Sequence, residues 1–244
     1  MKKFFLILIE IIFLIIIIFC SIKIFMWWKE NKENQKILSD ILDESIIIST
    51  TTNNAESSIE NYEINMEKLK EKNEDCVGYI KINGIDIQYP VVQGENNNFY
   101  LSHSFDKSDN SAGWIFLDYR NKLDRTDKNI IIYGHNRRDG SMFGKIKNAL
   151  NSKWYLEEKN RKIDFITENE KNEYEIFSIY KIPEEEYYLT TDFNDDKSYQ
   201  DFLNTLKQRS IQDFGIDLSS KKSILTISTC DNNNKYRIVI HSCK

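Results

Sequence analysis

Thr-Ile-Ser-Thr-Cys at residues 226–230 is a β-type run that ends in a thiol. Seven residues after Cys230, Arg237 lies at the start of another β-type run, Tyr-Arg-Ile-Val-Ile. A third such run, Ile-Ile-Ile-Tyr-Gly-His-Asn at 130–136, ends with His135 and an asparagine. A β-fold can bring several strand ends to one end of a sheet or barrel, so we expect Cys230, His135 and Arg237 to share one site.

The three side chains have complementary chemistry. Cysteine and histidine suffice for acyl transfer, because the thiolate attacks a carbonyl carbon and the imidazole manages the proton of the leaving group. Arg237 then stabilises the developing oxyanion or orients the substrate. A cysteine at the end of an apolar strand is, on its own, more often a small buried residue. The matching contexts of His135 and Arg237 favour the catalytic interpretation of Cys230.

Composition and charge argue against several other functions. The chain has 244 residues and a formal net charge of −5. Its length is enough for one domain of ordinary size and an anchor, and its charge gives no indication of nucleic-acid binding. The sequence contains no His-Glu-x-x-His pattern, no paired Cys-x-x-Cys and no glycine-rich phosphate loop. We therefore expect no metal ion and no cofactor.

An apolar segment at the N-terminus predicts a membrane anchor. Lys2 and Lys3 precede a mostly apolar run over residues 4–28, which at about 1.5 Å per residue spans a hydrocarbon core of roughly 30 Å. A cleavable signal peptide is the alternative, but its apolar region is only about 7–15 residues long and ends in small residues. Lys29 and Lys32 flank the other end. The catalytic interpretation therefore decides the orientation, with the N-terminus in the cytoplasm and the remaining chain outside.

Residues 29–75 are polar and helix-favouring, and we expect a stalk helix, a loop and a second helix there. Apolar residues recur at helical spacing over 37–42. A Ser-x-x-Glu capping box at 57–60 and an apolar stripe over 59–69 predict the second helix. The expected organisation is an anchor at 1–28, a helical stalk at 29–75 and a catalytic domain at 76–244.

From residue 76 onward the pattern changes to short β-type runs. They lie at 77–82, 85–93, 112–119, 129–135, 162–167, 174–182, 223–229 and 236–243. Eight runs at this spacing predict a mostly β fold, either a barrel or a sandwich. Two helical inserts are expected, at 142–158 and at 198–211. Asp196 or Ser198 is the expected cap of the second insert.

Several other titratable residues have structural interpretations. His103 is expected at the surface, and His241 in the last strand is the one plausible competitor for the acid–base role. Cys76 and Cys243 either pair or are simply buried thiols. No carboxylate in the sequence is placed to orient His135 as in a serine protease triad.

Two charged groups are expected to be structural as well. Asp118 and Arg120 are interpreted as a structural pair. The acidic run at 184–186 is interpreted as a solvated loop. Neither is expected to take part in the chemistry.

These motifs together resemble the sortases, the membrane-anchored cysteine transpeptidases of Gram-positive bacteria. The resemblance rests on Tyr-Gly-His-Asn at 133–136, Ser-Thr-Cys at 228–230 and Arg237 in the last strand. Further segments resemble the class B branch: 77–80, 89–94, 116–121, 142–143 and 191–193. The likeness covers about residues 75–244, and the order and spacing of the motifs make it specific.

The resemblance implies an eight-stranded closed β-barrel, preceded by helices, with a long helix between the sixth and seventh strands. It implies cleavage of a C-terminal sorting motif after threonine, with a thioacyl intermediate that an amine of peptidoglycan or its precursor resolves. Cys230 matches the nucleophile, His135 the acid–base and Arg237 the oxyanion or substrate-orienting group. Four further positions match residues that line the family's groove: Asn97, Leu101, Tyr188 and Ser228.

Two departures from the class B pattern affect the expected substrate. The connection from Cys230 to Arg237 is short, with Asp231 directly after the cysteine, and Glu184 replaces a threonine that contacts the motif in some relatives. The alternatives are a thiol hydrolase or endopeptidase on the same fold, a pilin-polymerising sortase, and a non-enzymatic surface-binding module. An amine-acceptor assay and a thiol-reactive probe distinguish these alternatives.

Overall fold

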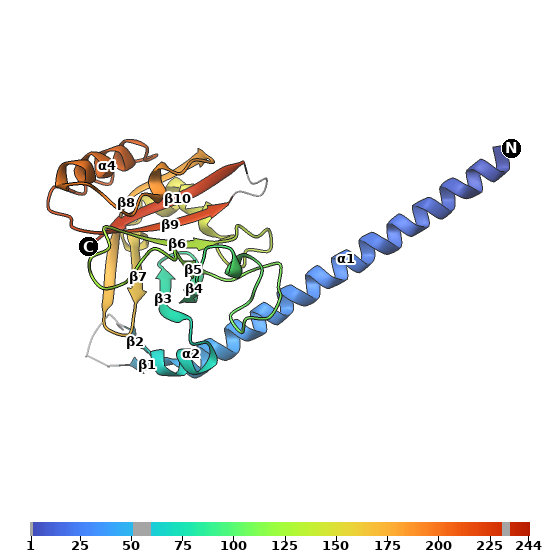
Figure 1. Cartoon of the computed structure of the whole chain (residues 1–244), viewed down its shortest axis with the longest axis horizontal. Helices are drawn as coiled ribbons and strands as arrows, with labels where there is room; N and C mark the ends of the chain where they lie inside the picture. The colour runs from blue at the N-terminus through green and yellow to red at the C-terminus, as the bar shows by residue number, and fades with distance from the viewer. Residues whose placement is uncertain (1, 51–59, 231–234) are drawn as a thin grey trace.

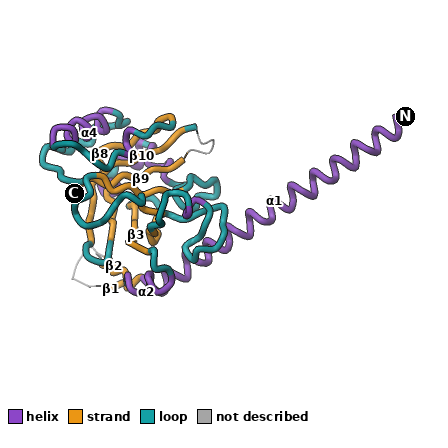
Figure 2. The backbone as a smooth tube through the Cα atoms, viewed as in Figure 1, coloured by secondary structure: helices purple, strands orange, loops and turns teal. Residues whose placement is uncertain are grey.

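The main body of the protein is a closed β-barrel, seen in a computed structural model that describes residues 2–50, 60–230 and 235–244. Of Cys230, only the main chain is described. The strands follow one another in the order β10-β8-β7-β3-β4-β5-β6-β9, and pairing of β9 with β10 closes the barrel (Figures 1 and 2). They are β3 (Cys76–Ile82), β4 (Ile87–Val92), β5 (Phe116–Leu117), β6 (Asn129–Gly134), β7 (Lys162–Ile166), β8 (Lys171–Pro183), β9 (Ile224–Cys230) and β10 (Tyr236–Cys243). The predicted eight-stranded closed barrel is confirmed.

Apolar side chains of the strands fill the barrel. Ile80, Val91, Ile132, Ile227 and Ile240, from five different strands, are all completely buried. β-Branched residues suit a pleated strand, and burial of each such side chain contributes about 1.5–3 kcal/mol. The isoleucine-rich runs of the sequence therefore specify both the strands and the core.

β5 is much shorter than the run expected at 112–119. Gly113 has a φ of 60°, a left-handed conformation that glycine adopts without steric cost. The main-chain nitrogen of Trp114 donates to the carbonyl of Tyr100 (2.9 Å). These residues therefore fold back onto the 3-10 helix η1 (Phe99–Leu101) instead of extending the strand.

The long helix predicted between the sixth and seventh barrel strands is α4 (Asp196–Gln208), between β8 and β9. Its apolar stripe, including Phe202 and Leu206, is buried. The cap is Asp195, not Asp196 or Ser198 as predicted. The Asp195 carboxylate accepts from the main-chain nitrogen of Ser198, which forms a capping box with it.

The insert expected to be helical over 142–158 is broken into short pieces. It contains η2 (Ile146–Leu150), α3 (Ser152–Tyr155) and the start of η3 (Glu158–Arg161). Met142 has a φ of 51° and cannot begin a helix. Asn151 is extended, and its side chain caps a new helix by accepting from the main-chain nitrogen of Lys153 (3.0 Å).

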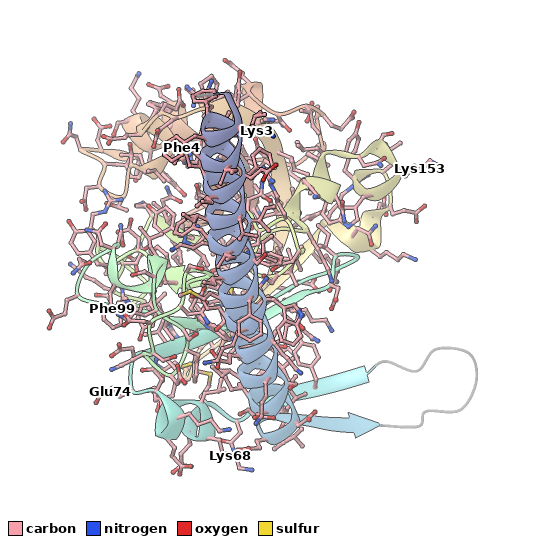
Figure 3. All side chains as sticks on the ribbon, turned by 90° about the vertical axis from the view of Figure 1, so that its right-hand side faces the viewer. Lys3, Phe4, Lys68, Glu74, Phe99 and Lys153 are labelled. Atoms are coloured by element: carbon pink, nitrogen blue, oxygen red, sulfur yellow. The ribbon has the colours of Figure 1, made fainter. Side chains whose placement is uncertain are left out.

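The region before the barrel contains a hairpin that the sequence analysis did not predict. β1 (Ile46–Thr50) pairs antiparallel with β2 (Glu60–Ile64), and Figure 3 shows the hairpin projecting from the end of the long N-terminal helix. The expected helix over 59–69 is wrong in its first half, and Ser57 of the expected capping box lies outside the described residues. The helix there, α2 (Met66–Lys72), begins only after Asn65, whose side chain accepts from the main-chain nitrogen of Lys68.

Tyr62 explains why β2 is extended. Its hydroxyl donates to the carboxylate of Asp164 on β7, and its ring contacts the ammonium groups of Lys81 and Lys171, each 4.4 Å from the ring centroid. A strand at 60–64 brings the Tyr62 side chain to these barrel partners. Tertiary contacts have overridden the helical periodicity of the sequence.

The N-terminal helix α1 (Lys2–Ser45) is continuous over 44 residues. Its first part extends far from the barrel, and its last part packs on the barrel (Figure 1). Within the described residues it is the one helix long and apolar enough to cross a membrane. The residues of α1 that pack on the barrel recur every three or four positions, as expected for one side of a helix. They are Asn31, Asn34, Leu38, Ile41 and Ser45.

Candidate active site

Strand register brings the three predicted catalytic positions to one end of the barrel. β9 and β10 are antiparallel, and Cys230 lies directly opposite Arg237. β6 and β9 are parallel, and Gly134 is paired with Thr229. His135 follows Gly134 and Cys230 follows Thr229, so the histidine and the cysteine leave neighbouring strands side by side. The side chain of Cys230 lies outside the described residues.

His135 is held by a backbone carbonyl. Its Nε2 atom lies 2.9 Å from the carbonyl oxygen of Leu101. A carbonyl oxygen can only accept, so Nε2 carries the proton of this bond and Nδ1 takes no part in it. This partner was not predicted from the sequence, because a main-chain acceptor leaves no signal in residue identity.

Arg237 forms an ion pair with Glu184. One guanidinium nitrogen of Arg237 donates to the Glu184 carboxylate, and another lies 3.3 Å from the carbonyl oxygen of Tyr236. The Arg237 side chain is only 16% exposed, whereas that of Glu184 is 64% exposed. Glu184 and Glu186 are exposed, as expected for a solvated loop, but the ion pairs of Glu184 and of Glu185, which pairs with Arg209, were not predicted.

We predict that Arg237→Lys loses much of the rate of the expected acyl transfer and that Arg237→Ala loses roughly 10²-fold. Lysine keeps the charge but lacks the planar fork of donors. A lysine still pairs with Glu184, so a purely surface ion-pair role predicts near-normal rates for Arg237→Lys. Steady-state rates of both variants test this, with Glu184→Gln as the control that removes only the partner's charge. Near-wild-type rates in both arginine variants would remove Arg237 from the site.

The predicted structural pair of Asp118 and Arg120 is confirmed and supports a cleft. Asp118 is completely buried and accepts hydrogen bonds from Arg120 (2.8 Å), Tyr133 (2.8 Å) and Asn97 (3.0 Å). Burial alone raises the pKa of a carboxyl, but the hydrogen bonds from Arg120 and Tyr133 and the charge of Arg120 outweigh it and hold the pKa of Asp118 below its usual value. Arg120 also donates to the carbonyl of Leu189 (3.0 Å), which fixes the opposite wall.

This cleft has a volume of about 620 Å³. Asn97, Arg120 and Tyr133 line one side, and residues of the segment 186–192 line the other. Tyr133 lies two residues before His135 in the chain. The cleft therefore adjoins the end of β6 from which the histidine projects.

The four positions expected to line a groove separate into two pairs. Asn97 is partly buried at the cleft, and Leu101 is 39% exposed. Tyr188 and Ser228 are instead buried, and their hydroxyl oxygens are 2.9 Å apart. Tyr188 and Ser228 thus lie beneath the surface, whereas Asn97 and Leu101 lie at it.

A second cleft, of about 630 Å³, lies at the other mouth of the barrel. It is lined by Ile130 at the start of β6, Ser223 before β9 and Lys244 after β10. Its central carboxylate, Glu170, is already paired with Arg125 and Lys244. The strand ends that carry the predicted catalytic residues are at the opposite mouth.

His241 is structural, as predicted, and does not compete for the acid–base role. It is completely buried, with Tyr180 Oη 2.8 Å from Nε2 and Thr226 Oγ1 2.8 Å from Nδ1. Burial lowers the pKa of His241 to about 3. Cys76 and Cys243 are buried free thiols and not a disulfide, and burial raises their pKa values to about 12 and about 11.

We predict that the domain loses stability in acid because of His241. The unfolded chain protonates this imidazole below about pH 6.5, whereas the folded protein does so only near pH 3. The unfolded state then binds more protons, so the free energy of unfolding falls by up to about 1.4 kcal/mol per pH unit in that window. Denaturant unfolding between pH 7 and pH 4 measures the slope. His241→Asn should flatten it, and an unchanged slope in that variant would contradict the assignment.

Comparison with known proteins identifies the family of the chain. A model of the sortase domain matches residues 80–244. The chain belongs to the sortase family. It is 36% identical to Sortase B of Listeria monocytogenes over 222 residues, which cover 91% of this chain and 87% of the relative. It is 32% identical to Sortase B of Staphylococcus aureus over 232 residues, covering 95% and 91%.

A solved structure shows the same class and fold. The crystal structure of sortase B from B. anthracis superposes with a TM-score of 0.75 at 30% identity, covering 88% of this chain and 98% of that one. The protein is therefore a class B sortase and, like other sortases, a cysteine transpeptidase. Its barrel is the sortase barrel that the sequence motifs predicted.

Proposed function

We propose that this sortase cleaves the C-terminal sorting motif of secreted proteins after threonine and transfers the protein to an amine of peptidoglycan or its precursor. The observation that carries this proposal is the strand register, in which Cys230 faces Arg237 and Gly134 adjoins Thr229. Family membership supplies the reaction class, and the register supports the assignment of the roles to these residues.

In the proposed acylation step, the Cys230 thiolate attacks the carbonyl carbon of the motif's threonine. The carbon–nitrogen bond breaks, the leaving amine takes a proton from the His135 imidazolium, and a thioester remains. In the second step an incoming amine attacks the thioester and gives its proton to His135, and the thiolate is released. Arg237 donates hydrogen bonds to the oxyanion or to a backbone carbonyl of the motif.

Asn97, Leu101, Tyr188 and Ser228 are proposed to form the motif-binding groove together with the cleft of about 620 Å³. Asn97 and Leu101 contact the motif directly from the surface. Tyr188 and Ser228 are hydrogen-bonded to each other below the surface and set the shape of the groove floor.

The decisive experiment is an amine-acceptor assay. The protein is incubated with a panel of sorting peptides, with and without an added amine such as triglycine, and products are resolved by mass. We expect a new amide only with the amine. Hydrolysis alone, unaffected by amine, would favour a thiol hydrolase. Absence of both cleavage and labelling by a thiol-reactive probe would favour a binding module.

Residues 1–28 are proposed to anchor the enzyme as a single membrane-spanning helix, with the catalytic domain on the extracytoplasmic side. We predict that a variant beginning at residue 29 is soluble and keeps its catalytic activity, because residues 4–28 make few contacts with the barrel and are exposed. Partition between membrane and soluble fractions measures the change. Insolubility or unfolding of the shortened chain would contradict this, and a mature N-terminus beyond residue 20 in cells would indicate signal-peptide cleavage.

A further inference from the structure

The last part of α1 makes polar contacts that a simple stalk does not need. Asn31 is 9% exposed and Asn34 is 3% exposed. A buried amide is costly unless its hydrogen bonds are satisfied. Asn31 accepts from the guanidinium of Arg137, and Asn34 accepts from the hydroxyl of Ser104. Asn34 also donates to the carbonyl of Gly113 (3.4 Å).

These contacts reach two loops, and the two loops together hold His135. The first is the loop 99–114, whose Leu101 carbonyl binds the imidazole Nε2 at 2.9 Å. The second is the loop 135–144, which contains His135 itself. The carbonyl of His135 accepts from the main-chain nitrogens of Arg137 (3.2 Å) and Phe143 (3.0 Å). The orientation of the ring therefore depends on how the two loops are placed relative to each other.

Gly113 shows how closely the loops approach at the ring. A Cβ atom built on Gly113 would lie 3.0 Å from Cδ2 of His135 and 2.9 Å from the carbonyl oxygen of Leu101. The residue that packs against the imidazole is thus the same residue whose carbonyl accepts from Asn34. Glu30 adds two contacts to this loop: its carbonyl accepts from Asn110 (3.1 Å), and its carboxylate accepts from Ser111.

We propose that Asn31 and Asn34 of α1 are positioning residues for His135. Asn31 fixes the loop 135–144 through Arg137, two residues from the histidine, and Asn34 fixes the loop 99–114 through Ser104 and Gly113. With both loops bound to one rigid helix, the Leu101 carbonyl keeps Nε2 protonated and leaves Nδ1 aimed for proton transfer. This inference rests on the proposed acid–base role of His135.

The attachment of α1 to the domain does not depend on these two amides. Farther along the helix, Ile41 is buried in the core, and Ile37 and Leu38 pack against it. At the C-terminal end, the Glu44 carboxylate pairs with Lys72 at 2.8 Å. Removal of one amide should therefore loosen the loops locally while the helix stays docked.

The test uses the full chain in detergent micelles, with kcat and KM measured across pH for transpeptidation of the preferred peptide. Asn31→Ala should lower kcat about tenfold, because a misplaced imidazole loses only part of the 10²- to 10⁴-fold that general acid–base catalysis supplies. KM should change less than about twofold. The pH profile should shift on the limb that reports His135. Asn31→Asp, which still accepts from Arg137, should restore the rate. Asn34→Ala should resemble Asn31→Ala.

Lys36→Ala is the matched control, because Lys36 lies on the exposed face of α1 and should leave kcat unchanged. Arg137→Met breaks the same bond from the loop side, so it serves if Asn31→Ala unfolds. Arg137→Met also removes the ion pair with Asp139 (3.5 Å), so the double variant Asn31→Ala/Arg137→Met should lose no more than Arg137→Met alone. A kcat within about twofold of wild type in Asn31→Ala or Arg137→Met overturns the inference. So does a loss of kcat that leaves the pH profile unchanged and is not rescued by Asn31→Asp.

His135→Ala, assayed in parallel, separates the two proposals. If His135→Ala stays active, the proposed acid–base role itself fails. If His135→Ala is inactive while Asn31→Ala is normal, only the positioning inference fails.

Discussion

Replacing Cys230 with alanine should abolish both cleavage of a sorting peptide and its transfer to an amine. The reason is covalent: without the sulfur no thioester forms, and neither step has another route. The fold should persist, because Cys230 is the last residue of β9 and its pairing with Arg237 uses main-chain atoms. Mass spectrometry of the peptide products, and of the acyl-enzyme in the wild type, measures the effect.

Two buried thiols provide the control for Cys230→Ala, in the chain that begins at residue 29 and so lacks the exposed Cys20. Cys76 and Cys243 are buried, with raised pKa values, so Cys243→Ala should retain labelling by a thiol-reactive probe at the active site. Cys230→Ala should lose that labelling in the folded state. Activity above a few per cent in Cys230→Ala would refute the assignment of the nucleophile.

His135→Ala should reduce transpeptidation by roughly 10²-fold or more, since the imidazole both donates the proton to the leaving amine and accepts one from the incoming amine. The described structure offers no substitute at this end of the barrel: His241 is completely buried, and His103 binds the carbonyl of Phe99 (2.7 Å) and Asp109 (3.1 Å). Steady-state rates with a fixed peptide and amine measure the loss.

Added imidazole distinguishes a chemical role of His135 from a structural one. It should restore part of the activity of His135→Ala, because the space left by the ring is next to the reacting groups. The unfolding midpoint should change little, as the ring is only partly buried. A rate within a few fold of wild type would move the acid–base role to another residue.

The barrel and the proposed catalytic positions were accessible from sequence for identifiable reasons. Isoleucine-rich runs such as 130–132 and 224–227 fit both the pleated strand and a buried core. Cys230, His135 and Arg237 lie at the ends of such runs, so strand register alone brings their main chains together. The side-chain geometry of Cys230 remains a prediction.

The features that could not be predicted from the sequence depend on partners far away in the chain. The helical stripe around Tyr62 gave no sign that Asp164, about a hundred residues later, would draw the segment into β2. The acidic run around Glu184 suggested a solvent-exposed loop and gave no sign that Glu184 would pair with Arg237 on β10, more than fifty residues later.

Asn31 and Asn34 were missed for a related reason. They lie on the same face of α1 as Leu38 and Ile41 but are polar. An argument from hydrophobic periodicity counts only apolar residues, so it does not detect a buried amide. Their partners are loop groups whose positions only the folded barrel defines. Buried polar contacts of this kind become visible only in the structure.

With α1 as the proposed anchor, the continuity of this helix would limit how far the catalytic domain can move from the membrane. A catalytic domain on a flexible tether would sample a hemisphere above its anchor, whereas a domain docked on the proposed membrane-spanning helix would stay at one height. The guanidinium of Arg137 lies 5.8 Å from the ring centroid of Trp27, a residue type enriched at membrane interfaces. With the proposed anchor in place, the histidine two residues away would lie close to the lipid headgroups. Substrates would then have to present their cleavage site within a thin layer beside the bilayer, and would find the enzyme by lateral diffusion.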